Sequence, residues 1–168
     1  MFIRNLYRTS IKLNIRNYTG NSTLKKPPKI LITDYAIAIF HDVIRKGQYQ
    51  CYLKPDTRLP MMHVRDALRA LSEYLEAPNE MLNRRVYNVT SMSFTPEELT
   101  EAMTKYIPEF KITYMPDSRQ EIADSWPQVF DDSEARRDWN WKPEVDLDNL
   151  VKLMVKEVKE KVAANGLS

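Results

Sequence analysis

Glycine is scarce in this chain. Its 168 residues include only three glycines, Gly20, Gly47 and Gly166, and no two of them are close together. Loops that cradle a phosphate or pyrophosphate need closely spaced glycines, because only a backbone without side chains can approach the anion. The sequence therefore excludes a glycine-rich nucleotide-binding loop.

Cysteine and histidine are equally scarce. Cys51 is the single cysteine, so no disulfide forms within the chain and a reducing compartment is expected. Together with His41 and His63 it makes no recognisable zinc-binding pattern. No apolar run is long enough to cross a bilayer. The composition, 43% hydrophobic and 29% charged, is that of an ordinary globular chain with one core.

Acidic residues are missing from the first 33 positions, which carry seven basic side chains. The rest of the chain holds 18 of the 25 basic residues and all 23 acidic ones. The chain is thus a basic arm joined to a mildly acidic body, a division that argues against a nucleic-acid-binding domain.

Within the basic arm, residues 1–27 have the composition of a mitochondrial transit peptide. Its basic residues recur at four-residue spacing: Arg4, Arg8, Lys12 and Arg16. Apolar and hydroxyl side chains lie between them, without the continuous apolar segment of a secretory signal. We predict a disordered leader that directs the chain to the mitochondrial matrix. The alternative is a disordered basic tail that adheres weakly to anionic surfaces.

A strand followed directly by a helix opens the folded part. The apolar run at 29–33 is typical of a strand buried on both faces. Helical spacing begins at Asp34 and ends before Gly47. The apolar face of this predicted helix comprises Ile37, Phe40, Val43 and Ile44. A strand, an abrupt turn and a helix begin a dinucleotide-binding unit, yet this turn contains no glycine.

Further elements follow from hydrophobic periodicity. Three more strands are predicted: 50–53, 85–89 and 111–114. A helix is predicted from Val64, with an apolar face of Ala67, Leu68, Leu71 and Leu75. Other helices are predicted at 117–123, from 133 to 138 and, as a long amphipathic helix, from Asp146.

The clearest local signal is a helix start at Thr95. Thr95 and Glu98 have the spacing of a capping box, and Pro96 occupies the first helical position. Phe94 and Leu99 are placed to form a hydrophobic staple across this start. The sequence therefore predicts a well-defined helix after residue 95.

Several of these segments resemble the C-terminal half of the extended short-chain dehydrogenases, the family related to NAD-dependent epimerases and dehydratases. The resemblance is carried by Thr33-Asp34-Tyr35-Ala36, Lys54 to Met62, Asp66 with Leu68 to Ala70, Tyr87-Asn88-Val89, Ser91 to Leu99, Ile122 to Pro127 and Asp131 to Trp141. Residues 28–33 separately resemble the first Rossmann strand of that family. The resemblance implies an α/β fold: a truncated Rossmann-like chain whose first strand is joined to a helix-rich, substrate-side part at 34–165. A fusion at Thr33 is what an internal deletion would leave.

The resemblance also implies a chemistry, the oxidation of L-threonine at its β-carbon with hydride transfer to NAD. Leu59-Pro60 replaces the Arg-Asp pair that holds the diphosphate in nucleotide-sugar epimerases, which disfavours a nucleotide-sugar substrate. The family reaction needs a tyrosine base with a lysine four residues later. None of the nine tyrosines has one. We therefore predict no catalytic residue, no NAD-binding residue and no bound NAD or metal in this chain.

Part of an amino-acid pocket is what the resemblance implies for this chain. Thr33 corresponds to a threonine beside the substrate, Trp126 covers the substrate, and Met61 or Met62 forms an apolar wall. The alternatives are structural, because a tryptophan beside a proline and a methionine pair are more often packing residues. His63 is interpreted as a helix-entry residue, and Asp131-Asp132 as helix capping rather than a pair of catalytic carboxylates.

Three hypotheses follow. The chain is a truncated dehydrogenase that is inactive alone, an interaction module that pairs with a full-length subunit, or a translation product without function. Separately from these hypotheses, we predict a marginally stable, aggregation-prone α/β fragment that becomes more stable when a partner supplies the missing layer.

Overall fold

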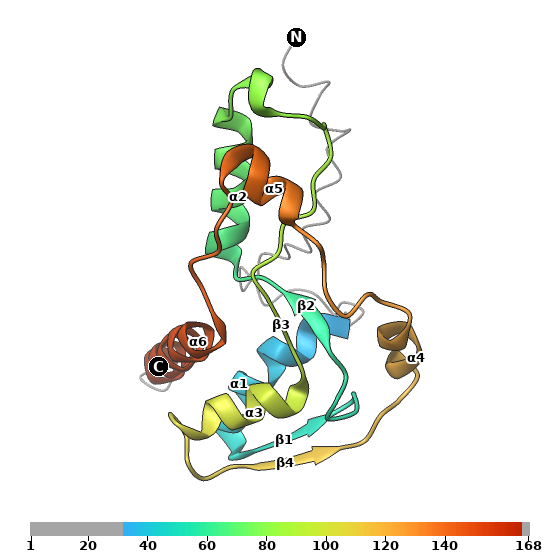
Figure 1. Ribbon diagram of the computed structural model, residues 1–168. Coiled ribbons are helices and arrows are strands. Elements are labelled where there is room, and N and C mark those ends of the chain that lie inside the picture. Colours follow the sequence, from blue (N-terminus) through green and yellow to red (C-terminus); the bar gives the residue numbers. More distant parts are fainter. Residues whose placement is uncertain (1–31, 166–168) are drawn as a thin grey trace, which may run out of the picture. The chain divides into compact units, whose positions relative to one another are not determined.

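The computed structural model describes residues 32–165, which form two compact units (Figure 1). The helical unit comprises Met62–Ser91 and Phe130–Val145. The sheet unit comprises residues 32–61, Met92–Val129 and residues 146–165. The predicted leader lies outside the described residues, as does most of the predicted first strand.

The sheet unit begins with a 3-10 turn, η2 (Ile32–Asp34), and helix α1 (Tyr35–Lys46). The prediction of a strand is therefore wrong for Ile32 and Thr33. These two residues have no strand partner among the described residues, and they turn the chain into α1.

Helix α1 ends as predicted, at a left-handed Gly47 (φ 68°) whose N–H donates to the carbonyl of Val43 at 2.9 Å. Its buried face comprises Tyr35, Ile39, Phe40 and Val43. The predicted face was wrong at Ile37, which is exposed. Tyr35 and Ile39 take its place, so the buried stripe is rotated from the predicted one.

The predicted strand around Cys51 is confirmed, two residues earlier than expected. Strand β1 (Gln48–Cys51) pairs in parallel with β4 (Lys111–Tyr114), and Cys51 lies opposite Tyr114. Side chains alternate between exposed and buried along β1, and Cys51 is fully buried. A separate antiparallel pair joins β2 (Leu59–Met61) to β3 (Met92–Phe94).

The capping box at Thr95 is confirmed. The Glu98 N–H donates to Thr95 Oγ1 at 3.1 Å, and the Thr95 N–H donates to Glu98 Oε2 at 3.0 Å. Helix α3 (Pro96–Thr104) follows, and both members of the predicted staple, Phe94 and Leu99, are buried.

Helices cover the parallel strands of the sheet unit. Helix α1 packs on β1 and on the long helix α6 (Leu147–Asn165), which also packs on α3. The N–H of Asn149 donates to the side chain of Asp146 at 2.8 Å, which caps the predicted start of α6. A small parallel sheet with covering helices confirms the predicted α/β class (Figure 1).

The helical unit consists of α2 (Val64–Glu76), the 3-10 turn η3 (Asn79–Met81) and α5 (Ser133–Trp139). Its core comprises Ala70, Tyr87, Ala135 and Trp141. The predicted strand at 85–89 is not formed, because no described strand pairs with it.

The predicted apolar face of α2 is correct only in part. Ala67 and Ala70 are buried, but Leu68 and Leu75 are 56% and 62% exposed.

None of the helices in the described part of the chain is long and apolar enough to span a membrane.

Candidate functional site

A pocket of about 190 Å³ lies in the sheet unit, between the turn after β1 and the segment of helix α4 (Arg119–Asp124). The turn folds back on itself, and the Thr57 N–H donates to the Lys54 carbonyl at 3.3 Å. Two cations, two carboxylates and one indole line the pocket: Lys54, Arg58, Asp56, Asp124 and Trp126. The predicted turn at 54–57 therefore becomes one wall of the pocket.

Gln120 joins the two walls of this pocket. Its Oε1 accepts the backbone N–H of Lys54 at 2.8 Å, and its Nε2 donates to Asp124 Oδ1 at 2.6 Å. The Thr57 hydroxyl lies 3.0 Å from the same Nε2. Gln120 is buried and its contact with Thr57 is shielded from water, so these bonds hold the turn against α4.

A second set of contacts, among Asp117, Arg119 and Tyr52, positions helix α4. Asp117 Oδ1 accepts two hydrogen bonds from Arg119, one from its backbone N–H and one from its Nε, each at 2.9 Å. The guanidinium carbon lies 3.3 Å from the centre of the Tyr52 ring, which ties α4 to the end of β1 by a cation–π contact.

Arg58 is held in place by contacts with β3 and α3. Its Nη1 donates to the carbonyl of Ser93 at 2.6 Å, and its Nη2 forms an ion pair with Glu98. Partial burial opposes ionisation of Glu98, but the bonds from Arg58 and from the Thr95 N–H outweigh it and lower its pKa. The capping box of α3 therefore also orients a cationic wall of the pocket.

The charges in the pocket are of both signs. Lys54 Nζ lies 3.9 Å from Asp124 Oδ2, with both side chains more than half exposed, so the pair is loosely held. A zwitterion could place its carboxylate against the cation of such a pair and its ammonium against the carboxylate side chain. Trp126 supplies an apolar wall beside them. The pocket is chemically suited to a small amino acid.

The four predicted substrate residues are not brought together. Trp126 is half-buried and lines the pocket. Thr33 lies in η2 and Met61 at the end of β2, both half-buried and neither in the pocket lining. Met62 belongs to the helical unit, where it packs against that unit's core. Their role in binding remains a prediction.

The sequence interpretation missed Lys54, Arg58, Gln120 and Asp124. The first two flank a turn rich in polar residues, which was interpreted only as a chain reversal. Gln120 and Asp124 stand four residues apart, a spacing that places them on one side of a helix. That spacing was the available signal, but their partner Lys54 lies 66 positions from Gln120.

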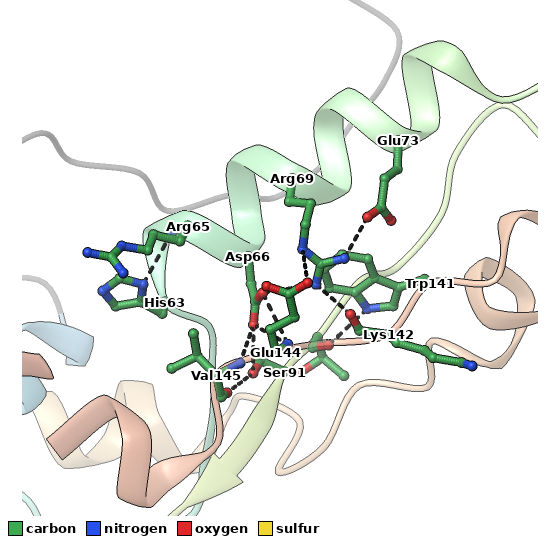
Figure 2. Close-up of polar contacts among 11 residues, drawn as sticks. His63, Arg65, Asp66, Arg69, Glu73, Ser91, Trp141, Lys142, Glu144 and Val145 are labelled. Atoms are coloured by element: carbon green, nitrogen blue, oxygen red, sulfur yellow. Dashed lines mark hydrogen bonds and ion pairs between the residues drawn. The ribbon is translucent and has the colours of Figure 1, made fainter. Parts of the chain in front are cut away.

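A second polar cluster lies in the helical unit, around the buried carboxylate of Asp66 (Figure 2). Its Oδ2 accepts the N–H groups of Glu144 and Val145, each at 3.0 Å. The hydroxyl of Ser91 lies 3.5 Å from the same oxygen and donates to the Val145 carbonyl at 2.6 Å. Asp66 therefore fastens the first turn of α2 to the segment after α5.

Arg69 closes the Asp66 cluster from the next turn of α2. Its Nη2 lies 3.0 Å from Asp66 Oδ1, and its guanidinium carbon lies 4.7 Å from the ring centre of Trp141. Burial favours the neutral form, yet hydrogen bonds to Asp66 and Glu73 outweigh it and raise the pKa of Arg69. Every oxygen of Asp66 has partners, so the cluster is structural, as a satisfied buried carboxylate usually is.

The other polar residues singled out in the sequence are also structural. His63 precedes α2, and its Nδ1 accepts the Arg65 N–H at 3.3 Å, which confirms the helix-entry interpretation. Asp131 Oδ1 accepts the N–H of Ser133 at 2.9 Å at the start of α5, as predicted. Asp132 instead pairs with Arg136 at 2.7 Å and 2.9 Å.

Tyrosines in the core of the sheet unit are poor candidates for a general base. Burial raises the pKa of Tyr35, Tyr49 and Tyr52 above the ordinary value, whereas a catalytic tyrosine needs a lowered pKa. The hydroxyls of Tyr35 and Tyr49 are buried and have no hydrogen-bond partner among residues 32–165. Histidine, cysteine and carboxylate side chains of residues 32–165 form no cluster that could hold a metal ion.

Comparison with known proteins shows which proteins the chain is similar to. No family model matches the chain. It is 49% identical over 150 residues to the protein named L-threonine 3-dehydrogenase, mitochondrial, of Bos taurus, and 51% identical over 150 residues to that of Sus scrofa. It is 40% identical to an uncharacterised epimerase/dehydratase of Staphylococcus haemolyticus. The matches cover 89% of this chain but only 40% of each mammalian protein.

Solved structures give the same result for the fold. The L-threonine dehydrogenase of Phytophthora infestans superposes with a TM-score of 0.78 at 44% identity, over 82% of this chain and 45% of that one. The holo form of the GalE-like L-threonine dehydrogenase of Cupriavidus necator gives 0.75 at 45% identity, over 80% and 44% of the two chains. The chain thus spans less than half the length of these relatives. In sequence and in fold, the chain is therefore similar, as a partial match, to the epimerase-like L-threonine 3-dehydrogenases.

Proposed function

We propose that this chain is a substrate-side part of a mitochondrial, NAD-dependent L-threonine dehydrogenase and does not oxidise threonine by itself. The family supports the reaction, since the mammalian relatives carry that activity and compartment in their names. The acid-free leader composition supports the compartment. The chain's own sequence supports a truncated form, since the apolar run at 29–33 continues into the helix from Asp34 without the glycine turn of a dinucleotide-binding unit.

The pocket of the sheet unit supports the choice of substrate. L-Threonine is a zwitterion with a short side chain, and the pocket offers Lys54 and Arg58 to its carboxylate and Asp56 and Asp124 to its ammonium. Trp126 would then cover the side chain, the role expected from the family resemblance. This juxtaposition of both charge signs around an indole is the observation that carries the proposal.

The described residues do not fit a bound NAD. A pyrophosphate needs free N–H groups at a helix start, approached through a glycine turn. Among residues 32–165 the single glycine is Gly47, at the end of α1, and the start of α1 carries the carboxylate of Asp34. An anion at Asp34 repels phosphate, so we assign no cofactor-binding residue and derive no hydride transfer for this chain.

Two titrations test the proposal. Adding L-threonine to isotope-labelled protein should shift the Trp126 indole N–H resonance, and Trp126→Ala should weaken the binding. The control is Trp139→Phe, since Trp139 lies in the core of the helical unit and should leave binding unchanged. NAD should cause no shift and no NADH should form. A dissociation constant for NAD below the millimolar range, or NADH formation, would contradict the proposal.

Of the remaining two hypotheses, one has a specific observation in its favour. The exposed leucines of α2 favour an interaction module that pairs with another polypeptide. A non-functional product instead predicts that the chain has no cooperative melting transition, which differential scanning calorimetry measures directly.

A further inference from the structure

The four charged side chains of the sheet-unit pocket differ in how far the fold already uses them. Arg58 is committed, because its Nη1 donates to the Ser93 carbonyl at 2.6 Å and its Nη2 pairs with Glu98. Asp124 is committed through Oδ1, which accepts the Nε2 of Gln120 at 2.6 Å. A ligand that took these groups would leave Ser93, Glu98 or Gln120 without a partner, which counts against binding. Arg58 and Asp124 therefore hold the pocket together.

Lys54 and Asp56 are the charged residues of the pocket that stay available to a ligand. Both are exposed. Within residues 32–165 the Lys54 ammonium makes no hydrogen bond, and its ion pair with Asp124 is loose, at 3.9 Å. The Asp56 carboxylate has neither a hydrogen bond nor an ion pair in the described part of the chain. A cation and an anion that the described residues leave available thus line the same pocket.

The backbone that carries this pair sets it apart from other exposed charges, which are common on any surface. Lys54 and Asp56 occupy the first and third positions of one turn, closed by the bond from the Thr57 N–H to the Lys54 carbonyl at 3.3 Å. Pro55 lies between them, and its ring fixes the backbone φ at the second position. The two charges are therefore neighbours on one defined turn.

The same turn is anchored to two helices. The Pro55 carbonyl accepts the N–H of Glu97, in the first turn of α3, at 3.1 Å. The Lys54 N–H donates to Gln120 of α4 at 2.8 Å. A backbone held on both sides does not have to be ordered when a ligand arrives, so the entropic cost of binding is smaller. The available charges are thus presented by a preorganised part of the pocket.

We propose that Lys54 and Asp56 are the specificity-determining residues of this pocket, and that they select zwitterionic α-amino acids over amines and carboxylic acids. Lys54 binds the ligand's carboxylate, and Asp56 binds its ammonium. A small amino acid carries both charges on one carbon, so it can engage both members of a pair that lies on one turn. This inference rests on the proposed function and assigns a residue to each charge of its substrate.

The experiment titrates the full chain with three compounds and follows the Trp126 indole N–H resonance. L-Threonine carries both charges. L-Threoninol keeps the ammonium and the hydroxyl but lacks the carboxylate, and 3-hydroxybutyrate keeps the carboxylate and the hydroxyl but lacks the ammonium. The unaltered chain should bind L-threonine more tightly than either analogue, because each analogue engages only one member of the pair.

Two variants separate the roles of the pair. Asp56→Asn should weaken L-threonine and L-threoninol about three- to tenfold, the range for charged hydrogen bonds at an exposed site, and should not weaken 3-hydroxybutyrate. Lys54→Gln should weaken L-threonine and 3-hydroxybutyrate by a similar factor and should not weaken L-threoninol. A purely structural role would weaken all three compounds alike, so the pattern across compounds is the decisive readout.

The matched controls are Asp42→Asn and Lys46→Gln, which make the same changes in an ion pair of 2.9 Å on α1, outside the pocket lining. They should change each affinity less than about twofold. Three outcomes overturn the inference: a variant of the pair that leaves L-threonine binding unchanged, equal weakening of all three compounds, or controls that act like the pair. If L-threonine binds the unaltered chain, such an outcome sinks this inference alone. If L-threonine causes no shift of the Trp126 resonance, the proposed function fails and this inference fails with it.

Discussion

The hydroxyl of Tyr87 donates a 2.6 Å hydrogen bond to Oδ2 of Asp138, across 51 positions of sequence. The Asp138 carboxylate also accepts hydrogen bonds from the side-chain amide of Asn83 at 3.1 Å and from the Nε of Arg137 at 2.9 Å. The bond from Tyr87, with the bonds from Asn83 and Arg137, lowers the pKa of Asp138 from 3.8 to about 2. This carboxylate therefore stays ionised in the fold at pH values where a free aspartate is protonated.

The first prediction concerns acid stability. A folded-state pKa below the unfolded value means that the unfolded chain takes up the proton first. The contribution of Asp138 is thus complete above about pH 4 and is lost as the pH falls toward 2. Tyr87→Phe should lower stability at pH 7 and flatten its decline between those two pH values. Urea unfolding followed by Trp139 and Trp141 fluorescence, in a Trp126→Phe background, measures this.

The control for that prediction is Tyr74→Phe. Tyr74 belongs to the same aromatic group, but its hydroxyl donates to the Arg85 carbonyl and not to a carboxylate. Its removal should leave the pH dependence unchanged. An equal pH dependence in Tyr87→Phe and in the background protein would sink the prediction.

A second prediction concerns the start of α3. Thr95→Ala removes a confirmed cap and should lower the free energy of unfolding of the sheet unit by about 0.5–2 kcal/mol, the usual cost of losing an N-cap. Thr104→Ala is the comparison, because Thr104 is exposed and its hydroxyl donates to the Glu101 carbonyl of the same helix. Urea midpoints monitored by Trp126 fluorescence should separate the two variants. Equal midpoints would contradict the role of the cap.

The third prediction concerns the pocket wall. Gln120→Met keeps the side-chain size but deprives the Lys54 N–H of its acceptor, which should cost about 1–3 kcal/mol in unfolding free energy. The shift of the Trp126 resonance with L-threonine should also weaken, because the turn is no longer held to α4. Glu121→Gln, at an exposed neighbouring position, should behave like the unaltered chain. Unchanged threonine binding in Gln120→Met would show that the pocket is not the site.

The fourth prediction concerns the leader. A fluorescent protein fused behind residues 1–30 should enter mitochondria, because the segment is basic and free of acidic residues. Changing the four spaced basic residues to glutamate should abolish import: Arg4, Arg8, Lys12 and Arg16. Microscopy with a mitochondrial dye is the measurement, and a diffuse signal from the unaltered fusion would leave only the alternative of a basic tail.

Local signals were predictable from the sequence, and the capping box at Thr95 and the left-handed Gly47 are the clearest cases. Both depend on residues within one turn of the helix end, so no distant contact is needed to interpret them. The strand at 111–114 was predictable for a similar reason, since its alternation is visible in four residues.

The errors share a physical cause, which is dependence on partners elsewhere in the fold. Residues 85–89 have a strand pattern, but a strand forms only where another strand pairs with it. Leu68 and Leu75 have core spacing, yet which sector of α2 is buried depends on the elements that pack there. Apolar periodicity indicates which side of a helix or strand favours burial. It does not indicate whether the chain contains an element that packs on that side.

The candidate site was less predictable than the fold. Trp126, which was predicted through family resemblance, lines the pocket. Gln120 and Lys54 are joined by one bond that spans 66 positions. No local pattern reports such a bond, because each partner alone looks like a surface residue. Met61 and Met62 show the reverse problem for prediction from sequence. They are adjacent in the chain, yet they belong to separate units of the structure.

The order of synthesis gives the Asp66 cluster a temporal consequence. Asp66 leaves the ribosome long before the N–H groups of Glu144 and Val145, which lie 78 and 79 positions later. At ordinary translation speeds the interval is roughly 4 to 16 s. For that time the partners of this carboxylate do not yet exist and the helical unit cannot close, so the nascent chain stays open to chaperones.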